Sequence, residues 1–291
     1  MKKCLIFTLA VGIGLVAAGM VGRAAEPFAV TVSGQAGKPA ILFIPGLACD
    51  GAVWKETVEH YQKTHECHVL TLAGFAGQPP VEGPFFDVVS KAVANYCAEK
   101  KLTKPIVIGH SLGASLALKL AAEHGEKIGA AIAVDGFACT MALFLPTATD
   151  SQRQAIGKAE QDKIMKQTQA EYTADTKKMF SNWLKSERLE QCSRWIEKSD
   201  RETVARAKGE LFALDVRPQL KKANVPVLIL AGYSPDLKHM FPNSQAFEKG
   251  VKAQLDGVAK GAVAVHPNCK HFIMWDEPKW MTDQIDAFLK K

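Results

Sequence analysis

Residues 106–123 read IVIGHSLGASLALKLAAE: a short apolar run, the pattern Gly-His-Ser-Leu-Gly, and a helical stretch of small and aliphatic residues. In a strand–Gly-x-Ser-x-Gly–helix arrangement the serine lies on a tight, strained turn. Gly109 and Gly113 are needed there because side chains would clash with the adjoining strand and helix. The turn exposes the Ser111 hydroxyl at a helix N-terminus, where backbone N–H groups and the helix dipole stabilise negative charge. Ser111 is therefore a candidate nucleophile, against the alternative that the turn only begins a helix.

The overall composition is that of a globular protein. The 291 residues are 47% hydrophobic and 23% charged, which suffices for one large core or for a core plus a small inserted subdomain. The formal net charge is +6, but the Lys and Arg residues are scattered and form no basic stripe. We therefore expect a small-molecule partner and no nucleic acid.

The first 24 residues form a separate unit. Lys2 and Lys3 precede an almost unbroken apolar run over 4–21, and small residues follow at 22–25. This order predicts a secretory signal peptide cleaved after Ala24, a secreted or periplasmic product, and no stable membrane span after cleavage. An uncleaved anchor is the alternative, since the run just reaches the length of a membrane span.

Six cysteines remain after the predicted signal. An even number in an oxidising compartment permits disulfides, but the sequence does not fix their pairing. No Cys-x-x-Cys spacing indicates a metal or redox site. Cys49 and Cys269 lie close in sequence to the candidate active-site loops.

Short apolar runs alternate with helical stretches along the chain. The runs cover residues 28–33, 40–44, 68–72, 106–108, 130–134, 227–230 and 262–265. Such alternation predicts an α/β fold with a mostly parallel sheet flanked by helices. We expect core segments at 25–136 and 211–291, separated by a helical cap insertion at 137–210.

The insertion has its own character. Residues 150–209 contain no proline and many Lys, Glu, Gln and Ala residues with periodic apolar positions. Ser199 and Glu202 have the spacing of a helix-capping box. One helical face carries an apolar stripe, which we expect to dock on the sheet domain rather than contact substrate; it consists of Met179, Phe180, Trp183 and Leu184.

The segment FACTMALFLP at 137–146 directly follows an expected strand, where ligands of α/β folds bind. Phe137 and Met141 are the predicted substrate-binding residues.

A serine hydroxyl needs a base, and the base needs a third group to orient it. In open α/β sheets of this kind the chain order is serine, acid, histidine. His271 is the favoured base because it follows the last expected strand by a few residues. His266 ends that strand and is expected to be structural.

The acid has two candidates. Asp236 follows the apolar run VPVLILAG by a short turn, and Asp135 directly follows the preceding strand. We favour Asp236 and keep Asp135 open. Asp215 is expected to fix a helix-to-strand connection instead.

The oxyanion that forms during attack requires two donors. One is expected to be the backbone N–H of Leu112, directly after Ser111. The other is expected to be the N–H of Leu47, because Gly46 lets the loop after strand 40–44 turn toward the serine.

Five segments resemble the α/β-hydrolase superfamily, specifically its lidded esterase-like members. They are IPGLACDGAVW, HVLTLAGFAGQP, IVIGHSLG, DVRPQLKKANVPVLILAG and HFIMWDEPKWMTDQIDAFL, with Trp54 as the aromatic that packs under the first loop. Pro45 and Ala73 stand where many members have histidine and aspartate, and the spacing from Asp236 to Pro242 is long.

The resemblance implies a serine hydrolase that forms an acyl-enzyme on a small or medium ester and needs no metal or organic cofactor. Two other readings stay open: a lyase or carbon–carbon bond hydrolase on the same fold, and a non-catalytic ligand-binding protein.

Overall fold

The computed structural model describes residues 26–184 and 186–290. The predicted signal peptide at 1–24 lies outside these residues, so cleavage and export stay predictions. Within the described ranges, no helix combines the length and apolarity needed to cross a bilayer.

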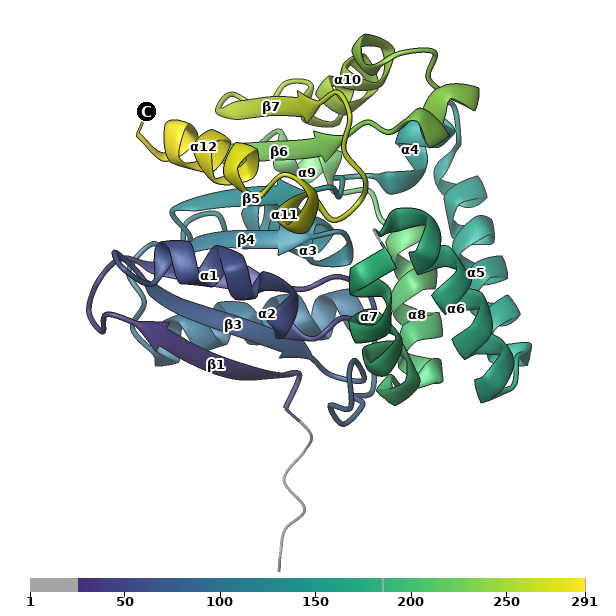
Figure 1. Cartoon of the computed structure of the whole chain (residues 1–291). Coiled ribbons are helices and arrows are strands. Elements are labelled where there is room, and N and C mark those ends of the chain that lie inside the picture. The colour runs from purple at the N-terminus through teal and green to yellow at the C-terminus, as the bar shows by residue number, and fades with distance from the viewer. Residues whose placement is uncertain (1–25, 185, 291) are drawn as a thin grey trace, which may run out of the picture.

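In the described part of the chain, seven strands form one sheet in the order β1-β3-β2-β4-β5-β6-β7 (Figure 1). All neighbours are parallel except β1 and β3. The strands are β1 (Phe28–Gly34), β2 (Ala40–Ile44), β3 (Glu66–Leu72), β4 (Ile106–His110), β5 (Ala130–Val134), β6 (Val227–Gly232) and β7 (Gly261–His266). The prediction of a mostly parallel sheet is confirmed.

The central strands are apolar because helices cover both of their faces. Every residue of β2, β5 and β6 is buried, as continuous apolar runs in parallel sheets lead one to expect. The edge strand β1 instead alternates in burial, and Val32 is 53% exposed.

Two groups of helices cover the sheet (Figure 1). On one face, α1 (Lys55–Tyr61), α11 (Ile273–Asp276) and α12 (Pro278–Leu289) contact one another. On the other face lie α2 (Phe85–Glu99), α3 (Leu112–His124) and α9 (Arg217–Leu220). Helix α10 (Ser244–Lys252) packs beside β7.

The predicted helical insertion lies between β5 and β6. After the short α4 (Thr140–Phe144), it contains α5 (Asp150–Lys166), α6 (Gln169–Trp183), α7 (Ser186–Lys198) and α8 (Arg201–Ala213). Figure 1 shows these last four helices, here called the cap, beside the carboxyl ends of the strands. The borders 137–210 stay a prediction.

The predicted capping box at the start of α8 is wrong by one residue. Asp200 is the N-cap, and its carboxylate accepts the Thr203 backbone N–H at 2.8 Å. The Ser199 hydroxyl instead accepts the Ala76 N–H at 2.9 Å, which ties the cap to the loop after β3. Asp200 caps the helix in place of Ser199 because an ionised carboxylate is a stronger hydrogen-bond acceptor than a hydroxyl at a helix N-terminus.

Asp215 fixes a connection, but it joins the helices α8 and α9 rather than a helix and a strand as expected. Its carboxylate accepts the Arg217 backbone N–H at 3.1 Å and the Arg217 guanidinium at 2.6 Å, and it lies 3.3 Å from Arg153 of α5. Burial opposes ionisation, but the hydrogen bonds and charge of Arg217 hold the pKa of Asp215 below its ordinary value.

Candidate active site

Ser111 lies on the strained turn that its sequence predicts. Its backbone has φ 54° and ψ −118°, between the end of β4 and the start of α3. The turn is close-packed: a Cβ on Gly109 would lie 1.9 Å from the Gly113 carbonyl oxygen, and a Cβ on Gly113 would lie 2.4 Å from the Ile44 carbonyl oxygen. The Ser111 N–H donates to the Val134 carbonyl at 2.9 Å, so the end of β5 holds the strained residue in place.

His271 pairs with Asp135. The ring Nδ1 lies 2.6 Å from Asp135 Oδ2, and both side chains are mostly buried. The other carboxylate oxygen accepts the Gly232 N–H at 2.8 Å, which fixes the plane of the carboxylate. A carboxylate at Asp135 accepts a hydrogen bond from the Nδ1–H group of His271. The free lone pair of the ring is then on Nε2, where a base needs it.

The prediction that Asp236 orients His271 is therefore wrong, and the alternative, Asp135, takes that position. Asp236 is exposed and lies in the short 3-10 helix Pro235–His239. Its backbone carbonyl oxygen lies 2.8 Å from the Nδ1 atom of His239. Asp135 has φ 49° directly after β5, and its N–H donates to the Leu230 carbonyl at 2.7 Å. This conformation turns its carboxylate toward the end of β6 and the His271 loop.

His266 is structural, as expected for a residue at a strand end. Its ring contacts the Trp280 ring with centroids 5.2 Å apart, and its Nε2 lies 3.9 Å from Glu277.

The structure brings Ser111, Asp135 and His271 together around one cavity of about 370 Å³, here called the Ser111 cavity. In the described residues the Ser111 hydroxyl and the His271 ring form no hydrogen bond. Such bonds are often long before a substrate binds. The shared cavity is what places nucleophile and base within one site.

The expected oxyanion donors belong to the loop after β2 and to the residue directly after the serine. The turn after β2 is closed by a hydrogen bond from the Cys49 N–H to the Gly46 carbonyl at 3.1 Å. A Cβ on Gly46 would lie 3.2 Å from Ser111 Cβ, so the loop approaches the serine closely. Leu47 lines the cavity, and among the described residues neither its N–H nor that of Leu112 has a protein acceptor. Their role as oxyanion donors stays a prediction.

One of the two predicted substrate-binding residues is placed as expected. Phe137 lines the Ser111 cavity. The prediction for Met141 is wrong, because the segment forms α4, and Thr140, Leu143 and Phe144 face the cavity instead. Met141 is buried and is not among the residues that line the cavity.

The apolar stripe of α6 has two roles: part of it packs on the core, and part of it lines the Ser111 cavity. Phe180 is buried and contacts Phe272 of the core with ring centroids 5.8 Å apart. Met179 and Trp183 line the cavity, and the Trp183 ring lies 4.6 Å from the His271 ring. The stripe therefore docks the cap and also encloses the candidate base.

His110 is a site residue that sequence reasoning missed. It is fully buried, its Nε2–H donates to the His271 backbone carbonyl at 3.0 Å, and its ring centroid lies 4.7 Å from that of His271. Burial, with the nearby His271, holds the pKa of His110 well below its ordinary value, so the ring is neutral and can donate only one proton. The only sequence signal was its position beside Ser111.

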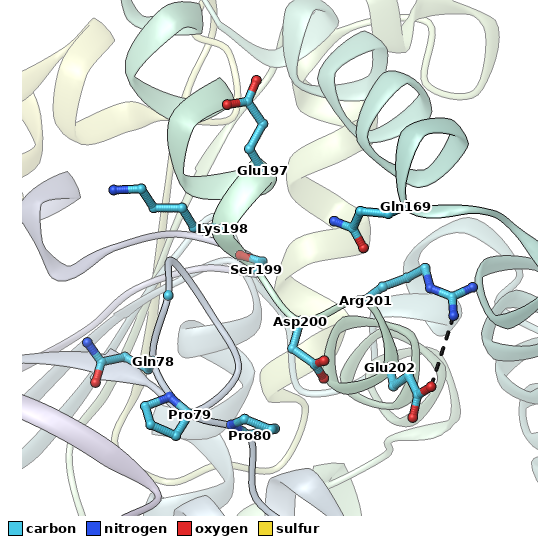
Figure 2. Close-up of a pocket in the computed structure, with 11 residues that line it drawn as sticks. Gln78, Pro79, Pro80, Gln169, Glu197, Lys198, Ser199, Asp200, Arg201 and Glu202 are labelled. Atoms are coloured by element: carbon cyan, nitrogen blue, oxygen red, sulfur yellow. Dashed lines mark ion pairs between the residues drawn. The ribbon is translucent and has the colours of Figure 1, made fainter.

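A larger hollow of about 540 Å³ shares no lining residue with the Ser111 cavity. Figure 2 shows Pro79, Pro80 and the start of α8 around it. Two of its charged groups are engaged in the fold: Asp200 caps α8, and Arg201 donates to the Met165 carbonyl at 2.9 Å. The hollow is a junction between cap and core.

The cysteines behave as core residues. Cys49, Cys67, Cys97, Cys139 and Cys192 are buried and form no disulfide in the described ranges, while the Cys269 thiol donates to the Lys270 carbonyl at 3.3 Å. Burial raises the pKa of Cys49 well above its ordinary value. The same ranges hold no cluster of three His, Cys, Asp or Glu side chains fit for a metal ion.

Comparison with solved structures finds the same fold. A hydrolase from Pseudomonas aeruginosa PA01 superposes with a TM-score of 0.72 at 16% identity, over 91% of this chain and 94% of that one. A thermophilic esterase from Thermogutta terrifontis gives 0.71 at 18% identity, over 90% and 93%.

Sequence comparison extends this finding. The chain is 23% identical over 257 residues to the biotin biosynthesis bifunctional protein BioHC of Cellvibrio japonicus (strain Ueda107), a match that covers 86% of this chain and 47% of that protein. The chain spans less than half the length of the curated relatives that it matches. The model of the alpha/beta hydrolase fold family matches residues 39–278, which is most of the chain. The protein therefore belongs to the alpha/beta hydrolase fold family.

Proposed function

We propose that the protein is an exported carboxylesterase that cleaves small or medium esters through Ser111, His271 and Asp135. The observation that carries the proposal is the 2.6 Å contact between His271 and Asp135 beside a cavity that Ser111 also lines. The family match and the esterase among the structural neighbours support the same reaction class.

In this scheme the Nε2 atom of His271 takes the Ser111 proton as the hydroxyl oxygen attacks the ester carbonyl. The Leu47 and Leu112 N–H groups donate to the resulting oxyanion. The imidazolium, stabilised by Asp135, then gives its proton to the departing alkoxide, which leaves an acyl group on Ser111. Water attacks this acyl-enzyme with His271 again as base, and the acid departs.

Labelling with a fluorophosphonate probe tests the nucleophile. We expect the wild type to be labelled at Ser111 and the folded Ser111→Ala variant to stay unlabelled. A folded wild type that is not labelled and hydrolyses no p-nitrophenyl ester would contradict the proposal, and it would favour a lyase or a binding protein.

The acid is tested by a matched pair of substitutions. We expect Asp135→Asn to lower kcat about 10³–10⁴-fold, because the amide would favour the wrong tautomer of the base. Asp236→Asn removes the same charge from an exposed position of the same cavity, and we expect it to retain kcat within about threefold. If Asp236→Asn lowered kcat for p-nitrophenyl butyrate more than Asp135→Asn does, Asp236 would be the acid of the triad instead.

A further inference from the structure

A second cavity of about 360 Å³ lies among α5, α6 and α8 of the cap and is here called the cap cavity. It shares four lining residues with the Ser111 cavity: Leu47, Met179, Asn182 and Lys208. The two spaces are therefore neighbours, and the residues that border both include Leu47 of the expected oxyanion loop. Each falls within the range that holds a small ligand group.

The two cavities differ in chemistry. Beyond the serine and its partners, the Ser111 cavity is walled largely by apolar side chains such as Phe137, Leu143 and Phe212. Most of the residues that line the cap cavity have polar side chains, and Lys163, Lys178 and Lys208 are among them. An ester that spans both would place an apolar part in the first and a polar part in the second.

The charges that line the cap cavity do not cancel. Three lysines face one carboxylate, Asp175, which already accepts the Gln167 side-chain amide at 2.6 Å. Lys208 lies 2.9 Å from Glu160, whereas Lys163 and Lys178 form no ion pair in the described ranges. The unbalanced charge in this space is therefore positive.

We infer that the natural substrate is an ester of an apolar acid with an anionic alcohol, whose phosphate or carboxylate lies in the cap cavity. This rests on the proposed function. With the carbonyl oxygen at the Leu47 and Leu112 N–H groups, the acyl chain fills the Ser111 cavity and the alcohol extends past Met179 toward the lysines. Because Lys163 and Lys178 are exposed, solvent and salt screen their attraction, and the selectivity that they give is modest.

Isosteric esters measure this preference directly. Butyrate esters of 4-hydroxybenzoate and 4-hydroxybenzamide differ in one charge, and monobutyryl glycerol 3-phosphate with monobutyrin forms the phosphate pair. We expect kcat/KM to be about five- to tenfold higher for the anionic member of at least one pair at low ionic strength, and this ratio to shrink in 0.5 M salt. The pair with the larger ratio identifies carboxylate or phosphate as the preferred anion.

Substitutions locate the preference. We expect the Lys163→Gln/Lys178→Gln/Lys208→Gln variant to bring the ratio close to one and Asp175→Asn to raise it. The control Lys158→Gln/Lys166→Gln/Lys177→Gln removes the same charge from cap positions that do not line the cavity and is expected to keep the ratio. Since loss of the Lys208–Glu160 pair could weaken the fold, Lys163→Gln/Lys178→Gln alone should lower the ratio in a variant whose melting temperature is unchanged.

Two results would overturn the inference: no preference in the wild type for either anion, or an equal loss in the control variant. Hydrolysis of the neutral esters in such a case would leave the proposed function standing. Failure to hydrolyse any ester, with no probe labelling, would instead overturn the proposed function itself.

Discussion

His110 couples the turn that carries Ser111 to the loop that carries His271. Its single imidazole proton is donated to the His271 carbonyl, and its other nitrogen, Nδ1, is buried without a partner. A Cβ on Gly46 would lie 3.0 Å from that Nδ1, so the expected oxyanion loop packs against the same ring. One neutral side chain thus contacts all three loops of the site and acts as a positioning residue.

Substitution of His110 should reduce kcat more than it changes KM. In His110→Leu the His271 carbonyl loses its hydrogen-bond donor. We expect kcat to fall about 10–100-fold because the His271 ring is no longer held in position beside Ser111. The amide nitrogen of glutamine takes nearly the place of Nε2, so His110→Gln should recover most of the loss. Ester kinetics of the two folded variants would contradict the role if both retained wild-type kcat.

The buried His110 also predicts how stability depends on pH. Its pKa is depressed in the fold by burial and by His271, while in the unfolded chain it takes up a proton as pH falls through about 6.5. The stability contribution is therefore present above that pH and is lost as pH falls below it. Below pH 6, the wild type should lose up to about 1.4 kcal/mol per pH unit that His110→Gln does not lose. Urea unfolding curves between pH 5 and 8 would contradict this if the two proteins changed in parallel.

Two helices of the cap meet at a pair of glycines. A Cβ on Gly157 of α5 would lie 2.3 Å from the Gly209 carbonyl oxygen of α8, and a Cβ on Gly209 would lie 2.8 Å from the Gly157 carbonyl oxygen. The missing side chains let the two backbones touch. This close approach sets the separation of the helices that enclose the cap cavity.

Gly157→Ala should destabilise the protein although alanine is the better helix former. In a free helix the change would stabilise by about 1 kcal/mol, but here the methyl group forces the backbones apart, and we expect a net loss of about 1–3 kcal/mol. Lys158→Ala, one position along on the same helix, is the control for propensity and should change the free energy of unfolding by less than 1 kcal/mol. A more stable Gly157→Ala variant in urea unfolding would refute the contact.

The strands and the nucleophile turn could be predicted from the sequence because they depend on local pattern. Parallel strands buried on both faces must be apolar throughout, and a serine between two glycines needs the sharp turn found at φ 54°. The acid could not be chosen this way. Asp135 and Asp236 follow neighbouring strands, and only the Gly232 N–H and the His271 loop, both distant in sequence, decide between them.

The roles of Met141 and His110 could not be predicted either, because they depend on helix orientation and on contacts between distant residues. The apolar segment predicts that Met141 lines the cavity, but the packing of α4 decides which of its side chains face inward. The role of His110 depends on a carbonyl 161 positions away along the chain. Such pairings are fixed by the packing of the whole sheet and its cap.

Cap and core are joined by contacts at several points of their boundary. The Glu210 carboxylate of α8 accepts the Phe85 and Phe86 N–H groups at 2.7 and 2.9 Å, so the cap supplies the N-terminal cap that α2 lacks. The Asp200 N–H donates to the Gly74 carbonyl at 2.7 Å. The Phe180 ring of α6 also contacts the Phe272 ring of the core. The insertion is therefore integrated into the fold rather than hinged on it.

This integration predicts that cap and core unfold in one transition. Glu210→Ala leaves two N–H groups of α2 without their acceptor, and we expect it to lower the free energy of unfolding by about 1–3 kcal/mol for both parts together. Far-ultraviolet circular dichroism, to which the helices of both cap and core contribute, and the fluorescence of tryptophans in cap and core should give coincident urea midpoints in wild type and variant. Glu202→Ala, on an exposed position of the same helix, is the control and should move neither midpoint. Two separated transitions, the first with only part of the helical signal lost, would show instead that cap and core unfold independently.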